Sequence, residues 1–197
     1  MDYGLRLITG PTIDPVSLAE ARAHCRIDES ADDGLVAGYL MAARSYIEST
    51  TGLSLISQTW EMTLHDWPLA DEGIVLPRQP VQSVTSVQYY DTAGALQTLA
   101  SAAYEIDTSA MPAQIVLADG YSWPQLDDRL APVVIRFVAG YGASPGSIPE
   151  AIRHAILLLV GHFYANREQV VVGAGLAVAQ LQYGVDALIA PYKVRGF

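Results

Sequence analysis

Histidines and neighbouring acidic side chains are the residues of this sequence whose types could do chemistry. His65 and Asp66 are adjacent and resemble half of a proton relay, but no serine in a Gly-x-Ser-x-Gly turn is present to complete it. His154 and His162 lie on one predicted helix, about 80° out of alignment, whereas zinc-binding helices space two histidines four residues apart. We therefore predict surface or packing roles for these four residues.

The other candidate groups are equally weak. Asp32-Asp33 and Asp127-Asp128 are adjacent pairs, and adjacency alone does not build a general acid and base. Gly140-Tyr141-Gly142 and Gly173-Ala174-Gly175 lack the Gly-Lys-Ser/Thr of a phosphate loop. Cys25, the single cysteine, lies on the apolar face of a short predicted helix, so we expect it to be buried and inert. The sequence predicts no catalytic residue, cofactor or metal, and therefore no enzyme.

Helices are predicted on both sides of a β-rich middle. After an extended arm from Asp2 to Pro15, a capping box at Ser17-Leu18-Ala19-Glu20 opens a helix that runs to about Ile27. A second helix spans roughly Asp32 to Thr51, and Gly52 suits its C-terminal end. The apolar stripe of this second helix comprises Val36, Leu40, Ala43 and Ile47.

In the middle of the chain, apolar and polar residues alternate with a period of two. Trp60, Met62 and Leu64 alternate with polar residues, which predicts a half-buried strand. Further strands are predicted at Ile74–Leu76, Val81–Tyr90, Gln97–Leu99, Tyr104–Ile106, Ile115–Leu117 and Val133–Val138. Strands at this spacing form an antiparallel sheet or small barrel. The predicted fold class is therefore α+β, a small helical bundle with an antiparallel β-rich insertion.

A long helix from about Pro149 to Arg167 is apolar around most of its circumference. One stripe comprises Ile152, Ala155, Ile156, Leu159, Val160 and Phe163, and a second capping box is predicted at Ser147-Ile148-Pro149-Glu150. Leu157 and Leu158 fall outside the stripe, so a second face is apolar too, which favours a subunit interface. The small apolar stretch after Glu168 needs a partner as well. The predicted interface residues are Leu157, Leu158, Val171, Val172 and Leu176.

Composition and charge exclude several classes of function. The 197 residues are 51% hydrophobic and only 16% charged, with a formal net charge of −10. Low charge again favours an oligomer, and an acidic chain lacks the Lys and Arg that give tight binding to nucleic acid. We expect no signal peptide and no transmembrane span. The single cysteine suits folding in a reducing cytoplasm.

Taken in order, several segments resemble the head–tail connector, or adaptor, proteins of long-tailed bacteriophages and related gene-transfer particles. The resemblance covers nearly the whole chain and is carried by Ser17–His24, Ser57–Glu61, Leu76–Val84, Val138–Gly142 and Ile148–His162. It implies one connector domain over residues 1–197, with helices at 16–52 and 147–197 and the β-rich insertion at 56–138.

The resemblance also implies a structural role in the virion neck. Family members form a ring, usually of twelve subunits, beneath the portal protein. The ring extends the DNA channel, through which DNA passes without sequence-specific binding, and it offers a platform to the next neck or tail-completion protein. Assembly in the bacterial cytoplasm without a membrane or cofactor is expected.

The C-terminal tail predicts a docking element, and the tryptophans suggest an alternative function. The tail follows a short predicted helix near Val185–Ala190, and its basic and aromatic side chains are typical interface anchors, so the resemblance implies docking on the portal. The docking residues are Tyr192, Lys193, Val194, Arg195 and Phe197. The alternative function is a β-rich binding module, for carbohydrate or protein, with exposed Trp60, Trp67 and Trp123; a hydrolase with a convergent carboxylate pair is third.

Overall fold

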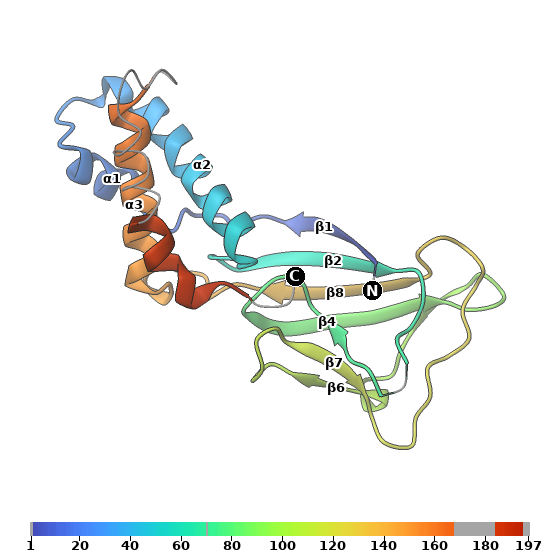
Figure 1. The fold of residues 1–197 in the computed structure, drawn as a ribbon. Helices are drawn as coiled ribbons and strands as arrows, with labels where there is room; N and C mark the ends of the chain where they lie inside the picture. Colours follow the sequence, from blue (N-terminus) through green and yellow to red (C-terminus); the bar gives the residue numbers. More distant parts are fainter. Residues whose placement is uncertain (1, 70, 168–183, 195–197) are drawn as a thin grey trace. The chain divides into compact units, whose positions relative to one another are not determined.

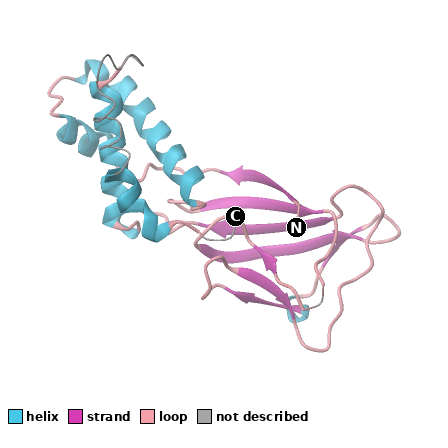
Figure 2. Ribbon diagram, viewed as in Figure 1, coloured by secondary structure: helices cyan, strands magenta, loops and turns pink. Residues whose placement is uncertain are grey.

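The chain folds into two compact units, each built from separate stretches of sequence (Figure 1). The computed structural model describes residues 2–69, 71–167 and 184–194. Residues 2–11, 57–141 and 194 form a β-rich unit, and residues 12–56 and 142–193, apart from the stretch 168–183, form a helical unit. Figure 2 shows the long helices and the strands in these separate units. The α+β class predicted from the sequence is confirmed, while a single connector domain over residues 1–197 stays a prediction.

A five-stranded antiparallel sheet is the centre of the β-rich unit. Its order is β1-β2-β8-β4-β5, so β1 is an edge strand. The strands are β1 (Tyr3–Thr9), β2 (Gln58–Leu64), β8 (Val133–Ala139), β4 (Val81–Tyr90) and β5 (Leu96–Thr98). The extended arm expected at the N-terminus is therefore a strand, because it pairs along β2 from Tyr3 opposite Leu64 to Thr9 opposite Thr59.

A second sheet of three strands supplies the other half of the β-rich core. Its order is β3-β7-β6. The strands are β3 (Ile74–Val75), β7 (Gln114–Leu117) and β6 (Tyr104–Asp107). Alternation in β8 buries Val133, Ile135, Phe137 and Ala139 because side chains on a strand point to opposite faces in turn. These residues form one core cluster with Ile74 and Ile115 of the second sheet.

Three helices and a short C-terminal helical segment form the helical unit. The elements are α1 (Leu18–Cys25), α2 (Asp33–Thr51), α3 (Glu150–Ala165) and the helical residues 184–189, followed by a 3₁₀ turn at Ala190–Tyr192. The predicted stripe of α2 is buried at all four positions. Helix α2 ends at Gly52, whose φ of 76° is left-handed, as expected for a glycine at this position. Further 3₁₀ turns lie at Ser30–Asp32, Ser101–Ala103 and Pro145–Ser147.

The two predicted capping boxes have opposite outcomes. At the start of α1 the box is present, because Ser17 accepts from the Glu20 backbone N–H at 3.2 Å and Glu20 accepts from the Ser17 backbone N–H at 2.8 Å. The box predicted at Ser147–Glu150 is wrong. Ser147 ends a 3₁₀ turn, and Pro149 occupies the N-cap with no side-chain hydrogen bond.

We expect Ser17→Ala to lower the stability of the helical unit by about 1 kcal/mol, because the first turn of α1 then loses its side-chain acceptor. Thermal unfolding of the whole chain measures the loss. Ser49→Ala is the matched control, since the Ser49 hydroxyl only donates to the Tyr46 carbonyl within α2, and its effect is expected to stay within about 0.5 kcal/mol. Equal effects of the two substitutions would contradict the prediction.

Candidate functional site

Helix α3 is the element that the sequence assigned to subunit contact. Its core stripe is buried as predicted at Ile152, Ala155, Ile156, Leu159 and Val160, whereas Phe163 is half-buried. This stripe packs within the helical unit, where α3 contacts α1 and α2.

The remaining predicted interface residues divide into two groups. Leu157 and Leu158 are half-buried on α3, so part of each side chain stays available to a neighbour. Val171, Val172 and Leu176 lie outside the described residues. A contact between subunits through this face stays a prediction.

The predicted docking tail is described only as far as Val194. Before the tail, Val185 and Ile189 are buried in the helical unit. Tyr192 is half-buried and Lys193 is exposed, with the Lys193 ammonium 3.5 Å from the Asp186 carboxylate. An exposed pair of this kind stabilises little, so the Lys193 charge remains accessible to a partner.

The last predicted docking residues lie mostly beyond the described part of the chain. Val194 is half-buried, and Arg195 and Phe197 lie outside the described residues. Docking of the tail on a portal protein therefore stays a prediction.

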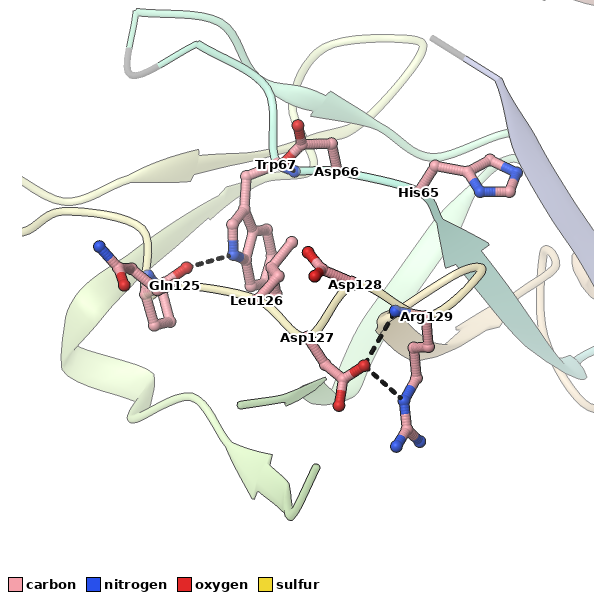
Figure 3. Close-up of a pocket in the computed structure, with 9 residues that line it drawn as sticks. His65, Asp66, Trp67, Gln125, Leu126, Asp127, Asp128 and Arg129 are labelled. Carbon is pink, nitrogen blue, oxygen red and sulfur yellow. Dashed lines mark hydrogen bonds and ion pairs between the residues drawn. The ribbon is translucent and has the colours of Figure 1, made fainter. Parts of the chain in front are cut away.

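A polar hollow of about 450 Å³ is lined in part by His65 and Asp66 (Figure 3). Asp66 accepts a hydrogen bond from the Trp67 backbone N–H at 2.8 Å, and Asp127 accepts one from the Arg129 backbone N–H at 2.9 Å. Figure 3 shows the His65 ring and the Asp66 carboxylate pointing in different directions. The two carboxylates thus complete local turns, and they do not form a relay with His65.

The tryptophans are packing residues of the β-rich unit rather than an open platform. Trp67 and Trp123 stack on each other with ring centroids 4.5 Å apart and an interplanar angle of 8°. Trp67 also donates from its indole N–H to the Pro124 carbonyl at 3.0 Å. Trp60 is covered by the Arg78 guanidinium, 4.9 Å from the ring centroid. All three are half-buried against the core cluster, so none of them is the exposed ring that the carbohydrate alternative requires.

An ion-pair cluster that the sequence did not predict lies on the outer face of the five-stranded sheet. Glu61 of β2 accepts hydrogen bonds from Arg6 of β1 and Arg136 of β8, both at 2.7 Å. Glu61 is 9% exposed. The pKa of Glu61 is lowered from its usual value, first by the hydrogen bond from Arg136 and then by the hydrogen bond and charge of Arg6. Burial of the carboxylate acts in the opposite direction but does not outweigh them. Sequence alternation places Glu61 on the polar face but does not identify its partners, which come from distant strands.

Two further clusters tie the chain segments of the helical unit together. Arg153 of α3 donates to the Pro15 carbonyl at 3.2 Å and pairs with Glu20 of α1. Asp32 accepts hydrogen bonds from the Tyr164 hydroxyl and from Arg167, both at 2.7 Å. These bonds lower the pKa of Asp32, and the bond from Tyr164 has the larger effect. Both clusters therefore join helices of this unit to one another.

Cys25 is half-buried, so the prediction of a buried thiol is wrong in degree. Partial burial raises the pKa of the thiol, which lowers its reactivity as the prediction expected. Within the described part of the chain, no group of three or more His, Cys, Asp or Glu side chains is placed to hold a metal ion. Among residues 2–69, 71–167 and 184–194, no helix is long and apolar enough to cross a membrane.

Comparison with known proteins relates this arrangement to virion necks. Residues 15–112 match the family described as phage gp6-like head-tail connector proteins. A chain in the virion of a native gene transfer agent particle is 29% identical, with 98% of this chain and 96% of that chain covered and a TM-score of 0.80. No curated protein matches the sequence.

Two structures of isolated necks are similar over the same length. A chain in the neck of the empty gene transfer agent particle, computed with C6 symmetry, is 29% identical, with 98% and 97% coverage and a TM-score of 0.78. A chain in the neck of the native particle, computed with C12 symmetry, is 28% identical, with the same coverage and TM-score. Since the family match and the whole-length likeness agree, this chain belongs to the phage gp6-like head–tail connector family and is a structural protein.

Proposed function

We propose that this chain is a subunit of a ring in the virion neck, twelve copies in number, that continues the DNA channel below the portal protein. The observation that carries the proposal is the likeness over 98% of the chain to a chain in a neck computed with C12 symmetry. The net charge of −10 suits a channel wall, because a surface with few cations does not retain a polyanion. The ring also presents a platform to the next neck or tail-completion protein.

Native mass spectrometry of the purified chain, alone and with its portal protein, tests the ring. Twelve copies of 21.2 kDa give about 254 kDa. A ring of this mass, either free or formed on the portal, is the expected result. A chain that stays at 21.2 kDa with and without the portal would exclude the ring and leave a binding module as the function.

We expect Leu158→Glu to abolish the ring while the chain stays folded. Leu158 is half-buried on the second face of α3, so the glutamate would place its carboxylate in the apolar contact predicted between subunits. Leu157→Glu is expected to act in the same way. Met41→Glu is the matched control on α2, where the side chain is 52% exposed, and this variant should keep the ring mass. Rings of unchanged mass in all three variants would remove α3 from the interface.

The tail can be tested separately from the ring. Deletion of residues 192–197 is expected to weaken binding to the portal at least about tenfold, because aromatic and basic anchors carry much of an interface's affinity. The ring mass should not change. A variant with the same six residues in reverse order controls for composition. Portal affinity equal to that of the full chain would exclude the tail as the docking element.

A further inference from the structure

The outer edge of β1 is largely apolar and has no strand partner among the residues that the structure describes. β1 is the first strand of its sheet, and β2 is its one neighbour among the described strands. Its exposed side chains include Tyr3 at 41%, Leu7 at 44% and Ile8 at 38%. The strand contains no proline or lysine, the residues that proteins commonly use to block an edge. Such an edge is a template for another strand.

Three other strands of this unit, β3, β5 and β6, also lie at a sheet edge, and of these three only β6 contains acidic residues. β6 is the last strand of the three-stranded sheet, and it exposes Glu105 and Ile106, the latter at 38%. Glu105 makes no ion pair among the residues that the structure describes. In Figure 1, β1 and β6 lie on opposite sides of the β-rich unit. One copy can therefore offer β1 to one neighbour and β6 to the other.

The charges of the two edges are complementary. The Arg6 side chain is 71% exposed, and its partner Glu61 is shared with Arg136, so two cations share one carboxylate and this three-residue cluster carries net positive charge. β6 holds Glu105 and Asp107 and no cation. In a chain with a net charge of −10, a positive edge and a negative edge on opposite sides favour a contact between copies.

The order of residues along the two strands strengthens this match. With Leu7 set opposite Ile106, a parallel pairing places Arg6 opposite Glu105, and an antiparallel pairing places Arg6 opposite Asp107. In either strand direction the apolar side chains meet and the arginine meets an acid. Cross-strand pairs of both kinds stabilise a sheet.

We propose that β1 of one copy lies along β6 of the next copy, with Leu7 against Ile106 and Arg6 against the acidic side chains of β6. The inference rests on the proposed ring and names one of its contacts. Because the two edges are different surfaces, the contact is head-to-tail, which is the type of contact that forms a ring when the rotation between neighbouring copies closes. Pairing of β1 with β1 would instead give a two-fold dimer.

Cross-linking of a double-cysteine variant tests the contact. In a Cys25→Ser background, Leu7→Cys and Ile106→Cys are combined, and the chain is treated with a short bismaleimide under the conditions in which mass spectrometry gives rings. We expect a ladder of covalent multimers on a denaturing gel, because each copy is joined on both sides. Either cysteine alone is expected to give monomers.

The controls separate failure of this contact from failure of the ring. Leu7→Cys with Leu130→Cys, a side chain 85% exposed in a loop, should give monomers. Rings by mass without a ladder from the Leu7/Ile106 pair would overturn the β1–β6 contact and leave the proposed function standing. Dimers from Leu7→Cys alone would overturn it in favour of β1–β1 pairing. A chain that forms no ring with or without the portal, and no ladder, would overturn both.

Discussion

Phe137→Ala is expected to destabilise the β-rich unit by about 3–5 kcal/mol, the usual range for deleting a buried phenylalanine ring. Phe137 is fully buried at the centre of β8, where its neighbours across the sheet are Trp60 of β2 and Val84 of β4. A cavity at this point removes contacts from three strands at once. Native-state hydrogen exchange measures the result directly, and protection of the β8 amides should fall by more than about 100-fold.

The neighbouring residue Val138 is the matched control for Phe137. Val138 points to the opposite face of β8 and is half-buried, so Val138→Ala is expected to cost about 1 kcal/mol or less. Similar losses of protection in the two variants would show that the cluster around Phe137 is not the centre of the unit's stability. Assembly of the ring should fail with Phe137→Ala if the β-rich unit takes part in it.

Glu61→Gln is expected to cost about 2 kcal/mol at pH 7, because two charge-assisted hydrogen bonds are weakened and two arginines lose their shared anion. Chemical denaturation of the two chains at a series of pH values measures the difference. Glu72→Gln is the matched control in the same unit, since this exposed loop carboxylate has little to lose and should change stability by less than about 0.5 kcal/mol.

The pH dependence of this effect has a definite sign. The folded-state pKa of Glu61 lies below the ordinary value of 4.5, so ionised Glu61 contributes its full stabilisation above the unfolded-state pKa. That contribution is lost as the pH falls through the lower folded-state pKa. The cost of Glu61→Gln should therefore shrink toward zero in acid. A cost that is constant with pH would assign the effect to packing rather than charge.

Local patterns in the sequence predicted most elements of the fold because each of those signals is contained in a few residues. The alternation of Trp60, Met62 and Leu64 marks β2, and Ser17 with Glu20 marks the start of α1. The start of α3 shows the limit of such patterns. There the Ser-x-x-Glu spacing is present, yet Pro145–Ser147 forms a 3₁₀ turn and the serine never reaches the cap position.

Long-range pairing could not be predicted in this way. The N-terminal arm is a strand only because β2, far along the chain, supplies its partner. The cluster of Arg6, Glu61 and Arg136 needs the order and register of three strands, which no local pattern contains. The interface residues predicted on α3 rest on excess apolarity alone, and apolarity favours a partner without indicating which surface of the partner is used.

The split origin of the β-rich unit determines when it can form during synthesis. β1 leaves the ribosome first, and its partner β2 begins only at Gln58. β8 joins β2 to β4, and it is complete only when Ala139 has been synthesised. At about 5–20 residues per second, the interval between β1 and β8 is roughly 6 to 25 s. During that time β1 has at most β2 as a partner, because β8 joins these two strands to the rest of the sheet. Helix α2 is complete well before β8, so the nascent chain holds a finished helix together with a partial, apolar sheet, and its exposure to aggregation is set by the rate of translation.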